Sequence, residues 1–485
     1  MEFVNHTPFP ALAFAGIDQF SQTFHVVALR QTLSWNDAGE LEYVEDQAPL
    51  CESDEFFGEA LAGSVRQESD LCHYKPRCDV IVNAVAHAPV TANGKPPSRF
   101  DVRLRVHLPD APAALPLEPH GLNPLMPASP EEMAQWRHAL ESAKRSTTPG
   151  KCLIDKTLTV TGERFFAKRA GLQRLAATLV KVSTLGLVRL PSWRLTAPAP
   201  LRTLPVRLEQ AFGGECRIDA NSKAASRVPK KHRLTPEQVA SHPEADTAPV
   251  AHASLAANPI GRGFATGWHL DATGMSRVPA PQIEDPAQPI TLRHFNQARA
   301  GDPEGPAAAS KLVVGLGIRP KGHPDRAKLT GTVDEEFISG DAPLPKDFDF
   351  AVWNAAWPDQ QVDALSGGEV IELVNLCAHD TPAARMDADG NCVLRLQLKQ
   401  TQCMLVVRME SGFMFLHPLK IDTLMIEPDQ RRVTLVWRAV LGDAEPIRKV
   451  EAQLFGTNER VFMEEMAALA RERRAGKPAP HVEGE

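Results

Sequence analysis

The sequence predicts a mainly β protein, built from two antiparallel β-sandwich- or barrel-like lobes with long loops and a few peripheral helices. Short apolar runs alternate with polar residues, which is the two-residue period of a half-buried strand. The 41 prolines and 31 glycines are spread along the chain and separate these runs. At 485 residues the chain exceeds the size at which one core stops growing, so we expect two or three domains.

The first half of the chain carries several strand signals. FHVVALRQTLSW alternates, NDAG supplies turn residues and LEYVED returns, so residues 20–46 predict a hairpin. Alternating strands are also expected at 80–86 and 100–108, with the turn signal Asn93-Gly94 between them. Further strand-like segments follow at 152–166, 179–190 and 202–214.

One surface helix is expected in this half, near 129–145. The preceding segment, 109–130, is rich in Pro, Ala and Leu and is typical of a loop. Ser129 then offers an N-cap, with Pro130 at the first helical position and acidic residues in the first turn. Because the segment is polar on most faces, we interpret it as an insertion packed on the surface.

The second half contains more hairpin signals. GGEVIELVNL alternates after a Gly-Gly turn, and Asp389-Gly390 indicates a turn before the strand CVLRLQL. MLVVRM and FMFLHP predict one hairpin, and TLMIEPDQRRVTLVWRAV predicts another, with its turn centred on Pro428-Asp429. After these strands, Asn458 is expected to cap a terminal helix that Gly476 ends.

The changes in composition suggest where the domains begin and end. Residues 1–270 are expected to form an N-terminal β-rich lobe, and residues 311–475 a C-terminal one that ends in the helix. The Pro-, Gly- and Ala-rich segment 271–310 would connect them. Residues 476–485 are expected to be a disordered tail.

Composition also bounds the function. A net charge of −7 supplies no basic field for nucleic acid or an anionic membrane. The start, MEFVNHTPFPALAF, lacks a basic residue followed by an apolar core, so we expect no secretory signal, and no segment is apolar enough for a membrane span. Eight irregularly spaced cysteines fit reduced thiols in a cytoplasmic protein.

No motif for a metal or cofactor is complete, so none is expected. Cys72, His73 and Cys78 lack paired C-x-x-C spacing and a second half-site. The DADGN segment at 387–391 resembles a calcium loop, but its glycine comes two positions early and Leu398 stands where a glutamate is needed, so we interpret it as a hairpin turn. GRGFATG at 261–267 matches a dinucleotide fingerprint only loosely.

Two groups of residues support alternative functions. Asp347 and Asp349 lie two positions apart, so an extended backbone would place both carboxylates on one side, as in a carbohydrate-active hydrolase. Trp353 or Trp357 would serve a lectin-like module as a sugar platform. The simpler interpretation gives the aspartates to turns and the indoles to the core.

Several segments, taken together and in order, resemble one family. They are SVRQESDLCHYKPRCDVIVNAVAHAP (64–89), TVTGERFF, LEQAFGG, NPIGRGF, LPKDFDF with PDQQ, and LSGGEVIEL. The chain resembles the domain of unknown function encoded in bacterial type VI secretion gene clusters, whose members act as effector adaptors or chaperones. The matching segments extend from the N-terminal region to about residue 440.

This resemblance implies a non-catalytic cytoplasmic protein. It would bind a type VI effector or its PAAR-type module and help to load that cargo onto the VgrG spike. The family offers no catalytic residues to carry over. Its recurring motif residues are types that set turns and satisfy backbone groups, so we expect them to be structural. In this sequence they are Asp70, Lys75, Pro76, Asp79, Gly213, Gly214, Asn258, Pro259, Gly261 and Gly263.

Overall fold

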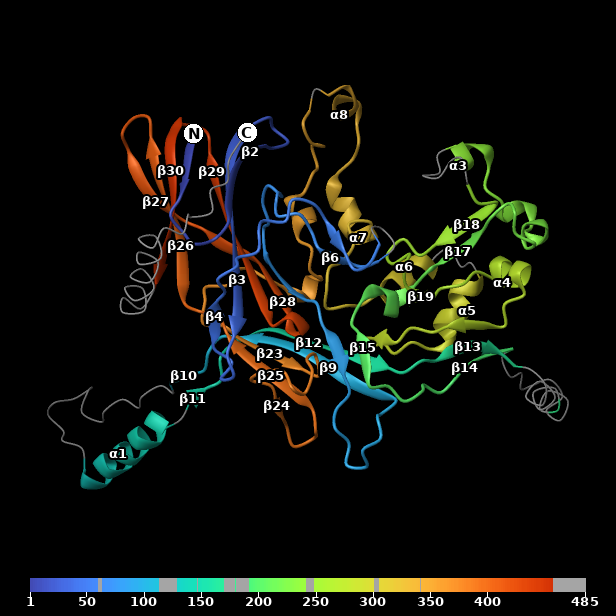
Figure 1. Cartoon of the computed structure of the whole chain (residues 1–485), viewed down its shortest axis with the longest axis horizontal. Coiled ribbons are helices and arrows are strands. Elements are labelled where there is room, and N and C mark those ends of the chain that lie inside the picture. The colour runs from blue at the N-terminus through green and yellow to red at the C-terminus, as the bar shows by residue number, and fades with distance from the viewer. Residues whose placement is uncertain are drawn as a thin grey trace.

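The computed structural model describes residues 1–59, 63–112, 129–145, 147–169, 179, 192–240, 248–300, 305–340 and 342–456. In this part of the chain, strands form several mostly antiparallel sheets, with long loops and a few short helices between them (Figure 1). The mainly β prediction is therefore confirmed, in its layered, sandwich-like form. Residues 180–190 of the strand expected at 179–190, the helix after Asn458 and the tail at 476–485 lie outside the described residues.

The largest sheet has seven strands and combines both ends of the chain. Its central strand pair, β3 (Thr23–Trp35) and β29 (Arg432–Gly442), is antiparallel, with Leu33 opposite Val433. Further strands extend the sheet on both sides of this pair, and one short strand pairs with β3 outside the main strand order. The other strands are β2 (Ala11–Ile17), β28 (Lys420–Glu427), β7 (Cys78–Val82), β22 (Gln361–Val362) and, beside β3, β4 (Leu41–Tyr43).

Two further sheets complete the main β body. The six-stranded sheet follows the order β21 (Ile283–Glu284), β12 (Cys152–Thr161), β9 (Arg99–His107), β23 (Val370–Val374), β25 (Cys392–Gln397) and β24 (Arg385–Met386). The four-stranded sheet follows the order β1 (Glu2–Asn5), β30 (Ile447–Gly456), β26 (Thr401–Met409) and β27 (Met414–Pro418).

The remaining strands form small sheets. Three strands pair as β14 (Trp193–Leu195), β13 (Phe165–Lys168) and β20 (Arg277–Pro279). The two-stranded pairs are β5 (Glu55–Phe56) with β6 (Val65–Gln67), β8 (Val85–His87) with β15 (Thr203–Pro205), β10 (Ala111–Pro112) with β11 (Thr147–Thr148), β16 (Phe212–Gly213) with β19 (Arg262–Gly263), and β17 (Glu215–Ile218) with β18 (Ala251–Ser254).

Helices are short and connect the strands. The α-helices are α1 (Pro130–Arg145), α3 (Pro236–Ala240), α4 (Gly267–Thr273), α5 (Leu292–Ala300), α6 (Gly305–Ser310), α7 (Pro324–Ala327) and α8 (Glu335–Ser339). Single 3-10 turns are η1 (Leu208–Gln210), η2 (Ala225–Arg227), η3 (Lys230–His232), η5 (Lys328–Thr330), η6 (Phe350–Trp353), η7 (Pro358–Gln360) and η8 (Pro428–Gln430).

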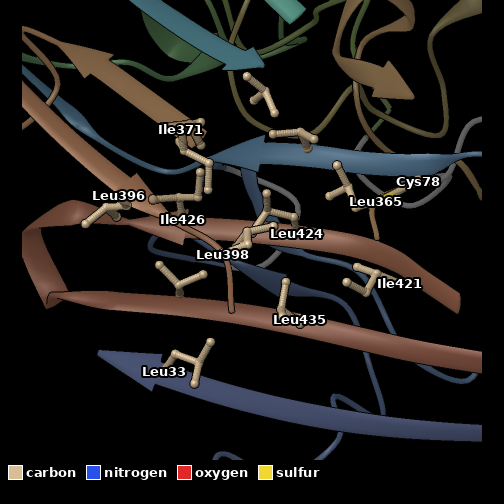
Figure 2. Close-up of a cluster of buried hydrophobic side chains, with 14 of the residues drawn as sticks. Leu33, Cys78, Leu365, Ile371, Leu396, Leu398, Ile421, Leu424, Ile426 and Leu435 are labelled. Carbon is tan, nitrogen blue, oxygen red and sulfur yellow. The ribbon is translucent and has the colours of Figure 1, made fainter. Parts of the chain in front are cut away.

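One hydrophobic core joins the three large sheets. Alternate residues of β3 and β29, such as Leu33 and Leu435, point toward side chains of β28, β23 and β25 (Figure 2). Ile426, Ile371 and Leu396 come from those three strands and are fully buried or nearly so. Because each such side chain contributes about 1.5–3 kcal/mol on burial, this shared core is what fixes the sheets against one another.

A second core lies beside the main β body, on the right of Figure 1. Its buried residues lie between Phe166 and Val313, with Trp357 added from a later segment. Phe166 and Phe295 stack at its centre, with ring centroids 4.3 Å apart. The chain thus forms the first part of the main body, builds the second core, and then returns to complete the main body.

The predicted division into lobes at 1–270 and 311–475 does not follow these sheets. β3 pairs with β29, and β9 pairs with β23, so both large sheets take strands from each side of the proposed boundary. The segment 271–310 is also not a simple connection. It contains β20, β21 and α5, and it buries Ile283 and Phe295 in the two cores. Because the segment is rich in proline and glycine, its sequence did not indicate that Ile283 and Phe295 would be buried in the cores.

The predictions that depend on neighbouring residues agree better with the structure. The hairpins at 20–46, at 423–440 and between β26 and β27 are confirmed. The helix expected near 129–145 is α1, where Ser129 accepts a hydrogen bond from the backbone N–H of Glu132 and Glu132 accepts one from that of Ser129. The strand expected at 80–86 is broken at Asn83 into β7 and β8, and β8 pairs with β15 rather than with β9.

Candidate functional site

The first part of the family-like segment, residues 64–77, lies along the outer face of the seven-stranded sheet, and the segment then enters that sheet as β7. On this face β3, β28 and β29 carry buried polar residues, opposite to the apolar side chains of the main core. Carboxylates and cations from the segment meet them there. We call this set the buried charge layer; its members are Arg30, Glu68, Asp70, Lys75, Asp79, Arg326, Asp422 and Arg438.

Asp70 joins the segment to β3. Its Oδ2 accepts hydrogen bonds from Arg30 Nη1 and from the backbone N–H of Cys51, both at 2.8 Å. Arg30 Nη2 also donates to Gln67 Oε1 at 2.8 Å. Two stretches of loop, around residues 51 and 70, are thereby attached to the face of the sheet.

Lys75 and Asp79 join the segment to β28 and to a later turn. Lys75 Nζ donates to Asp79 Oδ2 at 3.0 Å and to Thr423 Oγ1 at 2.7 Å. Asp79 also accepts from the backbone N–H groups of Ala355 and Ala356, at 2.9 and 3.2 Å. Burial alone would lower the pKa of Lys75, but the nearby carboxylates of Asp79 and Asp422 more than offset this and raise it, so the lysine stays charged.

The third pair of the layer is Asp422 with Arg438. Arg438 donates to Asp422 from Nε and to the carbonyl oxygen of Cys72 from Nη1. Burial raises the pKa of the Cys72 and Cys78 thiols, so both are protonated and poor metal ligands or nucleophiles. In the parts of the chain that the structure describes, no cluster of three or more His, Cys, Asp or Glu side chains has the geometry to hold a metal ion.

The buried charge layer has no room for a substrate. The cavity within it measures about 20 Å³, which is room for about one water molecule. Its charges are matched in pairs at hydrogen-bonding distance. The arrangement therefore holds loops on the face of the sheet, and its paired groups are not available for acid–base chemistry. The remaining motif residue of this segment, Pro76, is exposed in the bend before β7.

The second group of motif residues forms a tight crossing between β16 and β19. Asn258 is fully buried, and its Nδ2 donates to the carbonyl oxygens of Leu208 and Phe212 at 2.8 and 3.0 Å. A Cβ on Gly213, whose φ is +156°, would lie 2.1 Å from the Asn258 carbonyl oxygen, and one on Gly261 would lie 2.4 Å from Asn258 Nδ2. Only glycine permits this approach.

The other motif residues surround the same crossing. Gly214 donates its backbone N–H to Asn258, and Gly263, with φ +99°, pairs with Gly213 across the two strands. Pro259 is exposed beside Asn258. The structure thus assembles the predicted motif residues into two packed regions, the buried charge layer and this crossing.

The residues behind the alternative functions occupy loop positions. Asp347 accepts two hydrogen bonds from Thr332, at 2.7 and 2.9 Å, and Asp349 caps η6 by accepting from Ala351 N. The hydrogen bonds from Thr332 lower the pKa of Asp347, so its carboxylate is ionised. Of the two indoles, Trp357 is buried in the second core and Trp353 is half-buried. Asp387 accepts from the backbone of Asp389 and Asn391, in a hairpin turn as expected.

An exposed apolar edge was not foreseen from the sequence. β27 is the last strand of its sheet and pairs with β26 alone among the described strands, at the upper left of Figure 1. Phe413, Met414 and Leu416 are 63%, 53% and 58% exposed. The sequence marked this segment as a hairpin strand, but its alternation did not show that the outer face would stay uncovered.

A broad groove was also not foreseen. It measures about 1010 Å³ and lies between β12, the start of α7 and η7, at the junction of the main body with the second core. Lys156, Arg319 and His323 line it together with Trp357. These residues are scattered over some 200 positions of sequence, so no local motif could have marked them.

Among the helices of the described residues, none has the length and apolar character needed to cross a membrane.

Comparison with known families gives one match. A family of uncharacterized proteins conserved in bacteria, DUF2169, matches residues 21–112 and 143–438. The chain belongs to this family. The matched DUF2169 regions contain the buried charge layer and the glycine–asparagine crossing, and the gap between them contains most of α1. No curated protein and no solved structure matched the chain.

Proposed function

We propose that this DUF2169 protein is a non-catalytic adaptor of bacterial type VI secretion. In the cytoplasm it binds an effector, or the effector's PAAR-type module, and helps to load that cargo onto the VgrG spike. The resemblance of its ordered motifs to such adaptors supports this proposal. So does the use of those motif residues in packing, which leaves recognition to exposed surfaces.

The observation that carries the proposal is the apolar edge of β27. Met414 and Leu416 are two positions apart and therefore lie on the same face of the strand. Phe413 stacks on Phe415 beside them, with ring centroids 5.9 Å apart. An edge strand with exposed apolar side chains is suited to a protein partner, because an added strand gains backbone hydrogen bonds and buries those side chains.

Secretion of the effector encoded next to this gene tests the proposal. Deletion of the gene should abolish secretion of that effector while leaving the assembly of the secretion apparatus intact. Wild-type protein should restore it, and co-purify with the effector or its PAAR-bearing partner. Normal effector secretion from the deletion strain would contradict the proposed adaptor function.

The binding edge is tested by a matched pair of variants. Leu416→Glu places a charge on the edge of β27, and we expect it to weaken effector co-purification at least tenfold. Ile338→Glu makes the same kind of change on α8, at a residue that is 73% exposed against 58% for Leu416, and should leave co-purification unchanged. Equal effects of the two substitutions would remove β27 from the recognition surface.

A further inference from the structure

The broad groove contains a buried cation that the fold leaves unsatisfied. Five arginines are buried among the described residues: Arg30, Arg164, Arg319, Arg326 and Arg438. Four of them form ion pairs with a carboxylate, namely Asp70, Glu284, Glu68 and Asp422. Arg319, which is only 6% exposed, donates no side-chain hydrogen bond to any described residue, and its Nε is fully buried.

The backbone of Arg319 is fixed although its guanidinium is not bonded. Its N–H donates to the carbonyl oxygen of Ala355 at 2.8 Å, and its own carbonyl accepts from Arg326 at 2.7 Å. Burial, with the positive charge of Arg326, lowers the pKa of Arg319. Leaving the buried Nε without an acceptor is costly, and the cost is relieved when an acceptor arrives.

Other donors line the groove near Arg319. His323 is buried, and its Nδ1 accepts from the backbone N–H of Asp325 at 3.2 Å, which leaves Nε2 as the nitrogen that donates. Its ring stands edge-on to Trp357, with centroids 5.8 Å apart. Lys156 Nζ, held by Asp359 at 2.8 Å, lies 5.3 Å above the same indole.

The charge of Asp325 acts on Arg319, but none of the aspartates that line the groove forms an ion pair with it among the described residues. Asp155 is paired with Arg103, Asp359 with Lys156, and Asp325 with Lys328. Asp285 accepts from the backbone N–H of Ala287 in its own turn. These charges would repel a polyacidic ligand, but they leave the planar guanidinium of Arg319 free to receive one carboxylate through two parallel hydrogen bonds.

We propose that the groove binds a peptide through a single carboxylate that Arg319 receives. The dimensions favour a peptide over a small acid. The volume of about 1010 Å³ is at the upper end for small-molecule sites, and a second cavity of about 300 Å³ adjoins it, sharing Gln288 and Lys311. Leu158, Leu255 and Val313 supply apolar wall between the polar groups. This assignment does not depend on the adaptor function.

Thermal unfolding of the full-length protein tests the carboxylate site. Sodium acetate at 100 mM should raise the unfolding midpoint by about 1–3 °C over sodium chloride of equal ionic strength, because a ligand stabilises the state that binds it. Arg319→Met should abolish this rise. Arg293→Met removes an exposed arginine from the adjoining cavity and should keep it. A missing rise in the wild type, or a full rise in Arg319→Met, would overturn the site.

A pair of peptides tests the nature of the ligand. Acetyl-Leu-Ala-Leu-Ala-Leu with a free terminal carboxylate is compared by calorimetric titration with the same peptide as its terminal amide. We expect the acid to bind at least tenfold more tightly than the amide and at least tenfold more tightly than acetate. Equal affinity for peptide acid and acetate would assign the groove to small carboxylates and overturn the peptide assignment. Equal affinity for acid and amide would overturn the role of Arg319.

Discussion

Arg326 and Arg319 are seven positions apart and both buried, yet they are used in opposite ways. Arg326 donates from Nε to the carbonyl of Val352 at 2.7 Å and from Nη1 and Nη2 to the carboxylate of Glu68, both at 2.6 Å. Arg319 donates its backbone N–H but no side-chain hydrogen bond within the described chain. Glu68, which belongs to the family-like segment, forms an ion pair with Arg326 but not with Arg319.

The buried charge layer maintains the fold, whereas the side chain of Arg319 is available to a ligand. In the buried charge layer each cation has an anion at hydrogen-bonding distance, so breaking a pair leaves the other charge buried and uncompensated. In the groove the fold itself has left Arg319 uncompensated. Substitutions on the two sides should therefore have unequal, and at Arg319 even opposite, effects on stability.

The largest effect is expected at Arg326. Arg326→Met should lower the free energy of unfolding by about 3–5 kcal/mol, because Glu68 then loses its partner and two backbone carbonyls lose a donor. Arg319→Met removes no bond and should change stability by less than about 1 kcal/mol, or increase it. Urea denaturation of both variants measures the two values. If Arg319→Met is as costly as Arg326→Met, the comparison fails.

A comparable loss is expected at Asp79. Asp79→Asn removes the charge that balances Lys75, which is buried, and should cost about 3–5 kcal/mol by urea denaturation. Asp155→Asn is the matched control, because Asp155 pairs with Arg103 where both side chains are about 40% exposed. Such surface pairs contribute about 1 kcal/mol or less. Similar losses in the two variants would mean that burial does not set the strength of these pairs.

The smallest effect concerns an ion pair across strands β26 and β30. Hydrogen bonds from Arg408 and Lys449 lower the pKa of Glu451 to about 2. Because the folded pKa is below the ordinary value near 4.5, the pair stabilises the protein above that value, and this contribution disappears as the pH falls from 4.5 toward 2. Glu451→Gln should therefore lower the midpoint urea concentration at pH 6 and leave it unchanged near pH 2. A constant difference between wild type and variant over this range would contradict the assignment.

The sequence predicted the features that neighbouring residues determine. Pro428 and Asp429 specify the turn between β28 and β29, and Ser129 with Glu132 specifies the start of α1, because each acts within a few positions of backbone. The sequence also predicted that Asp70, Lys75 and Asp79 are structural residues. Their partners were not, because Thr423 and Ala355 are far along the chain.

The features that the sequence did not reveal depend on distant contacts. Alternation showed that β3 and β29 were strands, but nothing local identifies which strand each pairs with, so the predicted division into lobes did not anticipate a sheet that takes strands from both halves. Arg319 stands in an unremarkable Arg-Pro-Lys segment. Its importance comes from burial without an acceptor, which only the folded chain displays.

The pairing of β3 with β29 has a consequence for how the protein is made. Leu33 lies opposite Val433, so 400 residues must be synthesised after Leu33 before its partner exists. At about 5–20 residues per second this takes about 20–80 s. The hairpin with β2 covers one edge of β3 during that time, but the edge that pairs with β29 remains without its partner on the ribosome. Growing chains of this protein should therefore depend on chaperones that hold such an edge until translation has nearly ended.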